Sequence, residues 1–219
     1  MGRSLLNRWN LGRRQWWSRE RLFSHLDGHF SLFFFFFFLV ITVVVMCDLV
    51  ARTGRLQQRY ADGSRLVAGC IPFRYLNSES GKVVHVLMIS SSSGPGLLFP
   101  KGGWENDETV REAAVREAVE EAGVRGILMD FLGDYEFKSK THQDECSPEG
   151  LCKAAMYALY VKEELETWPE QKTRTRTWLT IEEAVENCRH AWMKDALVEG
   201  FCKWHKEKIG KGEEIAGYD

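Results

Sequence analysis

Apolar and polar residues follow two periods along this chain. Runs rich in β-branched and other apolar residues cover residues 66–75, 83–90, 127–137 and 154–161, which is typical of strands. Three other stretches, residues 107–122, 181–187 and 192–204, place apolar side chains at helical spacing. Strands interleaved with helices predict an α/β domain with a mixed sheet.

The pattern also divides the chain into three parts. We expect an Arg-rich and hydrophobic leader over residues 1–45, one domain over residues 46–202, and a polar flexible tail over residues 203–219. About 150 residues suffice for a single stable core.

The leader contains an uncharged stretch, residues 30–47, with six consecutive phenylalanines. As a helix it would be about 27 Å long, just enough to cross a membrane. Three interpretations stay open: a membrane anchor, a translated leader that is not in the native protein, and an Arg-rich organellar presequence. A membrane is therefore a partner only if residues 30–47 are present and inserted.

Charge and cysteine content narrow the class of partner. Residues 1–45 hold six arginines against Glu20 and Asp27, a balance of +4, so at a total of −2 the remainder carries −6. A net-acidic domain without a basic stripe argues against a nucleic-acid polymer and leaves small anionic molecules. Six cysteines without framework spacing predict reduced, intracellular thiols. His142, Cys146 and Cys152 match no common zinc pattern.

The most informative stretch is residues 102–124, GGWENDETVREAAVREAVEEAGV. Glu117, Glu120 and Glu121 are spaced i, i+3 and i+4, which puts three carboxylates on one helix face. Like charges repel there unless a hard cation such as Mg²⁺ or Mn²⁺ binds them. We predict Glu117 and Glu121 as metal ligands and Glu120 as a further or water-mediated ligand. The alternative is a solvated acidic face with pairs such as Glu112 with Arg116.

Other residues of this stretch have predicted roles in shaping the site. Asn106 or Asp107 is expected to cap the helix, and Gly123 to end it in a left-handed conformation. Arg116 would orient one carboxylate, and Lys101 would meet an anionic substrate beside the metals. Trp104 is expected to pack beneath the turn.

A divalent cation bound by carboxylates suits hydrolysis of a phosphoanhydride, because it offsets the anionic charge that repels a nucleophile. Catalytic roles are predicted for Glu121, Glu120 and Arg116. Glu121 is the candidate general base within the stretch. A base from the segment after the helix is the alternative, and the candidates are Glu136, Glu145 and Glu149.

The spacing G-x5-E-x7-R-E-U-x-E-E-x-G-U, from Gly102 to Val124, resembles the signature of the Nudix hydrolase family. The resemblance implies an α/β/α sandwich with a mixed sheet, Mg²⁺ or Mn²⁺ as cofactor, and turns at Gly102, Gly103 and Gly123. Further segments, ARTGRLQQRY (51–60), RLVAGCIPFRY (65–75), VLMISSS (86–92), LLFPKGGWE (97–105), WPEQ (168–171) and TWLTIEEA (177–184), resemble the plant Nudix proteins of the diphosphoinositol and dinucleoside polyphosphate branch. That branch implies phosphate contacts from Arg59, Arg65, Ser91, Ser92 and Lys101.

The implied activity is hydrolysis of diphosphate linkages in nucleoside or dinucleoside polyphosphates or in diphosphoinositol polyphosphates. The alternatives are an ADP-ribose or mononucleotide diphosphatase and a non-catalytic nucleotide sensor. The substrate would be a small anionic polyphosphate, and no obligate protein partner is predicted. We expect an intracellular location, in the cytoplasm or nucleus, with the mitochondrion or a membrane anchored through residues 30–47 as alternatives.

Overall fold

The computed structural model describes residues 51–52, 54, 56–78, 81–139 and 145–210. The chain divides into two units, Met1–Val45 and Met46–Asp219, and the described residues all belong to the second. The predicted leader, the apolar stretch 30–47, His142 and residues 211–219 lie outside the described residues.

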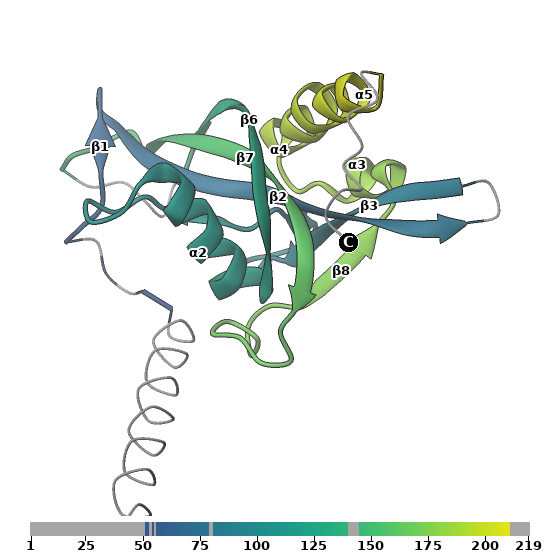
Figure 1. Ribbon diagram of the computed structural model, residues 1–219. Helices are drawn as coiled ribbons and strands as arrows, with labels where there is room; N and C mark the ends of the chain where they lie inside the picture. Colours follow the sequence, from purple (N-terminus) through teal and green to yellow (C-terminus); the bar gives the residue numbers. More distant parts are fainter. Residues whose placement is uncertain (1–50, 53, 55, 79–80, 140–144, 211–219) are drawn as a thin grey trace, which may run out of the picture. The chain divides into compact units, whose positions relative to one another are not determined.

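An eight-stranded mixed sheet forms the centre of the described domain (Figure 1). Its strands are β1 (Tyr60–Ala61), β2 (Ser64–Ser78), β3 (Gly81–Ser90), β4 (Leu97–Leu98), β5 (Lys101–Gly103), β6 (Val124–Lys138), β7 (Leu151–Glu164) and β8 (Arg176–Leu179). The main order is β4-β3-β2-β7-β6, with β1 and β5 on β2 and β8 on β3. The central strands β2 and β7 are parallel, whereas the other pairs are antiparallel.

Helices cover both faces of this sheet (Figure 1). They are α2 (Val110–Ala122), α3 (Ile181–Asn187), α4 (Ala191–Asp195), the π-helical segment η2 (Ala196–Cys202) and α5 (Lys203–Gly210). On β7, Tyr157 lies under Arg111 of α2, while Tyr160 packs with Phe73, which contacts Phe201 of η2. Residues three apart on a strand face opposite ways. The predicted α/β/α sandwich is therefore confirmed.

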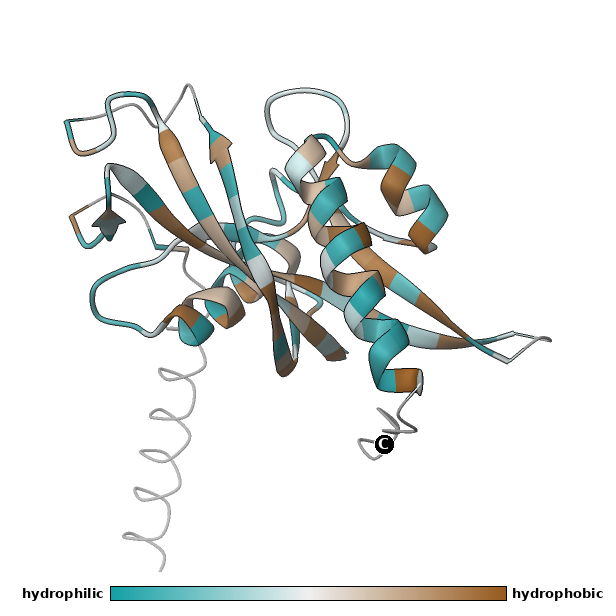
Figure 2. Cartoon of the chain, turned by 90° about the horizontal axis from the view of Figure 1, so that it is seen from above, coloured by the Kyte–Doolittle hydropathy of each residue, from teal (hydrophilic) through white to brown (hydrophobic). Residues whose placement is uncertain are grey.

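The core lies on both sides of the sheet. Ile71, Phe73, Leu87, Phe99 and Phe201 are fully buried. Figure 2 shows hydrophobic segments along the strands and mixed hydrophilic and hydrophobic turns on the helices, as surface helices of a packed domain require.

The four predicted long strands are confirmed, each slightly longer than its apolar run. Helix α2, which carries the acidic face, begins later than predicted, because Thr109 is its N-cap in place of Asn106 or Asp107. Thr109 and Glu112 form a reciprocal capping box, which satisfies the first free amides. Gly123 ends the helix at φ 61° and ψ 40°, the predicted left-handed cap.

The C-terminal helical region differs from its prediction in two ways. It widens into a π-helix over Ala196–Cys202, where a Cβ on Gly200 would come within 2.5 Å of the Tyr135 hydroxyl. It also continues as α5 to Gly210, so the start of the predicted flexible tail is helical. Within the described part of the chain, no helix is long and apolar enough to cross a membrane.

Candidate active site

The three predicted ligands, Glu117, Glu120 and Glu121, lie on the side of α2 that packs against β5. They are 7%, 5% and 6% exposed, so the alternative of a solvated acidic face is wrong. Gly102 lets the β5 backbone approach them, because a Cβ there would overlap the Glu117 carboxylate. Gly103 is equally confined, since its Cβ would overlap the Gln58 side chain.

Arg116 organises one end of this face. Its Nε and Nη2 donate to the two oxygens of Glu108 at 3.0 and 2.8 Å, and its Nη1 donates to Oε1 of Glu117 at 2.7 Å. Nη2 also donates to the Gly103 carbonyl at 2.8 Å. The predicted orienting position of Arg116 is thus present, and it links helix, turn and strand. Glu112 instead accepts the Thr109 amide in the capping box.

Glu121 is held by two donors from different segments. The Lys101 amide donates to Oε2 at 2.8 Å, and Arg174 donates to Oε1 through Nη2. Arg174 also donates through Nε to Glu170 at 2.7 Å. Sequence reasoning missed Arg174 and Glu170, because no spacing signal connects Glu121 with residues so far along the chain; Arg174 lies 53 positions away.

Burial is the main electrostatic feature of these carboxylates. Burial and then the neighbouring Glu121 carboxylate raise the pKa of Glu117 to about 8, although Arg116 opposes the shift. Burial also raises the pKa of Glu120 and of Glu121. The charged forms are therefore short of positive charge, which a divalent cation supplies.

The donor chemistry fits Mg²⁺ or Mn²⁺, since both ions prefer carboxylate oxygens. The side chains are nevertheless held apart by their own partners. Among the described residues, no group of three or more His, Cys, Asp or Glu side chains is arranged to hold a metal ion. Cation binding at this face therefore requires some of these partners to yield.

Two of the predicted phosphate contacts support the turn before α2. Arg59 donates to the Glu105 carbonyl at 2.9 Å and the Asn106 carbonyl at 2.8 Å, and its guanidinium lies 4.6 Å from the Trp104 ring centroid. Arg65 donates to Oε1 of Gln58 at 2.8 Å. Trp104 packs against the core and donates to the Glu108 carbonyl at 2.9 Å, so its predicted packing role is confirmed.

Of the other predicted contacts, Ser91 and Ser92 lie on the loop after β3, and Lys101 is the first residue of β5. Ser91 accepts a hydrogen bond from Arg189 at 2.8 Å, and Ser92 is exposed. Lys101 is half-buried, and its positive charge opposes the burial that raises the pKa of Glu121. Arg189, which sequence reasoning missed, also donates to the Ser93 carbonyl at 3.0 Å and so fixes this loop.

The candidate bases outside α2 are all exposed: Glu136, Glu145 and Glu149. Glu149 pairs with Lys138 at 2.8 Å. Cys146 is exposed and Cys152 is buried, and no disulfide joins the cysteines of the described ranges.

The comparisons with known proteins address this same region. The NUDIX domain family model matches residues 65–199. "Nudix hydrolase 16, mitochondrial" from Arabidopsis thaliana is 87% identical over 178 residues, which are 78% of this chain and 99% of that protein. "Diphosphoinositol polyphosphate phosphohydrolase 2" from Mus musculus is 35% identical over 57% of this chain and 63% of that protein.

A solved Ap4A hydrolase binary complex from C. elegans aligns at a TM-score of 0.49 and 20% identity, over 65% of this chain and 98% of that chain. The family match spans β2 to η2 and includes the whole acidic face of α2. The chain therefore belongs to the Nudix hydrolase family, enzymes that cleave phosphorus-containing acid anhydrides.

Proposed function

We propose that this protein is a Mg²⁺- or Mn²⁺-dependent hydrolase of diphosphate linkages in nucleoside or dinucleoside polyphosphates or in diphosphoinositol polyphosphates. The observation that carries the proposal is the buried face of α2, where three carboxylates meet cationic neighbours at the glycine turn. The name of the mouse relative, a diphosphoinositol polyphosphate phosphohydrolase, supports the choice of substrate class.

In this proposal Glu117 and Glu121 hold the cation, with Glu120 as a further or water-mediated ligand. The bound cation would offset the phosphate charge, acidify a water molecule and stabilise the leaving phosphate. Arg116 keeps the Glu117 carboxylate in place through its 2.7 Å contact. Gly102 leaves room for that carboxylate beside β5.

The chain's own groups also orient the substrate and receive the proton. Lys101 presents its ammonium next to Glu121, where it suits an anionic phosphate chain. Arg59, Arg65, Ser91 and Ser92 remain candidate phosphate contacts. The proposed proton acceptor is a carboxylate oxygen of Glu121, with Glu120 as the alternative.

The experiment is kcat/KM of the full chain with Mg²⁺ on a substrate panel. The panel contains diadenosine penta- and hexaphosphate, a diphosphoinositol polyphosphate, ADP-ribose, NADH and an oxidised dGTP. Preference for the long polyphosphates supports the proposal. Preference for ADP-ribose or a single nucleotide keeps the hydrolase chemistry and refutes the substrate class.

We also propose a mitochondrial location, since the Arabidopsis relative that is 87% identical carries that location in its name. Cell fractionation of the full chain tests it. Recovery in the cytosol or nucleus would contradict the mitochondrial proposal and agree with the location expected from the sequence.

A further inference from the structure

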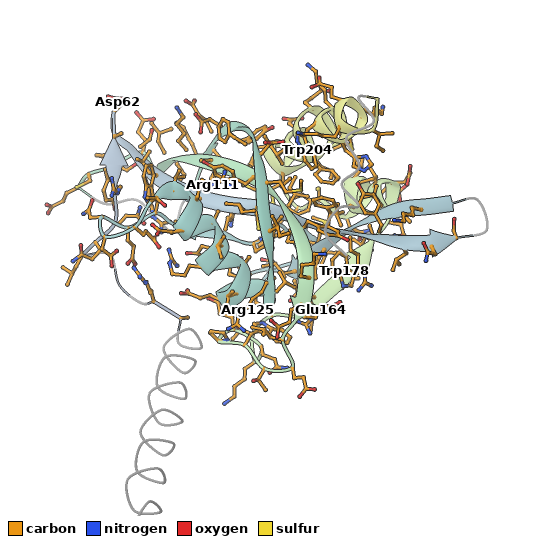
Figure 3. All side chains as sticks on the ribbon, in the orientation of Figure 1. Asp62, Arg111, Arg125, Glu164, Trp178 and Trp204 are labelled. Atoms are coloured by element: carbon orange, nitrogen blue, oxygen red, sulfur yellow. The ribbon has the colours of Figure 1, made fainter. Side chains whose placement is uncertain are left out.

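The loop between β7 and β8 is tied to the end of the helix that carries the acidic face. The Leu165 amide donates to the Gly123 carbonyl at 2.8 Å, and the Glu170 amide donates to the Glu120 carbonyl at 3.1 Å. Figure 3 shows Arg125 and Glu164 at this end of α2, where β6 begins and β7 ends. The loop therefore has a fixed position relative to Glu120 and Glu121.

From this loop Arg174 reaches Glu121 with a guanidinium that is almost fully engaged. Nη2 donates to Oε1 of Glu121, Nε to Glu170 at 2.7 Å, and Nη1 to the Ser90 carbonyl at 3.2 Å. The side chains of Arg174 and Glu121 are 14% and 8% exposed. The guanidinium thus supplies the positive charge that a buried carboxylate requires.

Both oxygens of Glu121 are already occupied. Oε2 accepts the Lys101 amide, which is fixed because Lys101 pairs with Gly69 in the sheet. Oε1 accepts a hydrogen bond from Arg174, which belongs to a loop. If this bond breaks, Arg174 still donates to Glu170 and to the Ser90 carbonyl. Of the two partners, Arg174 is the one that a cation can displace at small cost.

We propose that Arg174 is a built-in counter-ion of Glu121, and that the guanidinium and a divalent cation are alternative partners of the same oxygen. The metal-free site is then held folded and charge-compensated, and Glu121 passes from arginine to metal when the cation binds. Glu170 is a positioning residue that draws Arg174 away from Glu121. The inference rests on the proposed metal-dependent function.

The test is titration of the metal-free full chain with Mn²⁺ by calorimetry, for wild type, R174Q and R176Q. Removing a competing partner raises the competent fraction, so R174Q should bind Mn²⁺ with a Kd lower by about tenfold or more. The metal-free Tm of R174Q should fall, and Mn²⁺ should raise it by more than in wild type.

Arg176 is the matched control, because it is a neighbouring arginine that donates to the Ala122 and Gly123 carbonyls. A general field effect would make R176Q resemble R174Q and would weaken as the screening length shrinks from about 8 Å at 0.15 M salt to about 3 Å at 1 M. If Arg174 and the cation instead compete directly for the same oxygen, R174Q should still bind Mn²⁺ with a lower Kd than R176Q in 1 M NaCl.

The inference is overturned if R174Q binds Mn²⁺ no more tightly than wild type, or if R176Q tightens binding equally. If R174Q does not fold without metal, E170Q decides. Glu121 is then the one carboxylate left among the acceptors of Arg174 given above, beside the Ser90 carbonyl, and the Kd should rise. An unchanged or lower Kd overturns the inference. If wild type itself binds no Mn²⁺, the proposed metal-dependent function has failed.

Discussion

Gly123→Ala tests how tightly the β7–β8 loop is fitted to the end of α2. Gly123 has φ 61°, where a residue with a Cβ costs about 1–2 kcal/mol. The added Cβ would also lie 2.6 Å from Cδ2 and 2.9 Å from Cβ of Trp168. Moving that indole off its rotamer costs about 0.5–1.5 kcal/mol more.

The two contributions add to about 1.5–3.5 kcal/mol, which corresponds to a Tm lower by roughly 3–14 °C for a domain of this size. Urea unfolding and thermal melting of the metal-free protein measure both quantities. The variant should remain folded at 25 °C, because this loss is smaller than the roughly 5–15 kcal/mol by which native domains are typically stable.

Gly63→Ala separates the backbone cost from the steric one. Gly63 also has a positive φ, 71°, but nothing lies within 4 Å of its added Cβ. It should therefore lose about 1–2 kcal/mol only. In a Trp168→Ala background, which removes the indole but keeps the Cβ of residue 168 that lies 2.9 Å away, the cost of Gly123→Ala should fall toward the Gly63→Ala level. If Gly123→Ala costs no more than Gly63→Ala in the wild-type background, the proposed fit between Trp168 and the helix end is refuted.

Three further predictions concern the acidic face. E121Q should fold and lose at least about 100-fold in kcat with Mg²⁺, as expected for loss of a metal ligand and base. E112Q, which keeps the capping box, is the control and should retain activity. Wild-type kcat in E121Q would refute the ligand assignment. R116Q should lower the free energy of unfolding, measured in urea, by about 3–5 kcal/mol, because it leaves the buried Glu108 and Glu117 without their arginine partner. A loss below about 1 kcal/mol would show that the Arg116 ion pairs do not stabilise the fold. Because the folded-state pKa of Glu117 is about 8 against an ordinary 4.5, the folded protein binds more protons between these values. Its metal-free stability, measured by urea unfolding in EDTA, should thus fall as pH rises from about 5 to about 8, and an equally steep fall in E117Q would contradict this cause.

Local periodicity was enough to predict the four long strands, the acidic helix and its glycine cap. The N-cap was mispredicted because Asn106, Asp107 and Thr109 are all good caps, and only Thr109 has Glu112 three residues later to close the box. The π-helical segment was missed because its apolar residues keep ordinary helical spacing, and the close approach of Gly200 to Tyr135 in this segment is a tertiary contact that sequence spacing does not contain.

The charged partners of the site were harder to predict than its carboxylates. The carboxylates lie on one helix, so their spacing fixes a common face. Arg174 and Glu170 reach the site through a loop whose position depends on backbone contacts with Glu120 and Gly123. Arg59 donates most of its hydrogen bonds to carbonyls of the turn. From the sequence alone, an arginine that binds carbonyls cannot be distinguished from one that binds phosphate.

Gln58 and Phe201 lie just outside the family match, yet both are internal. Gln58 is 9% exposed, and its amide donates to the carbonyls of Arg59, Leu66 and Trp104. Phe201 is fully buried against Phe73 and Trp204. A fragment trimmed to residues 65–199 would therefore expose a hydrophobic socket and leave the Trp104 carbonyl without its two donors, the Arg59 amide and the Gln58 side chain. Limited proteolysis should accordingly leave a resistant fragment that retains both residues, and the segment that folds independently is longer than the segment by which the family is recognised.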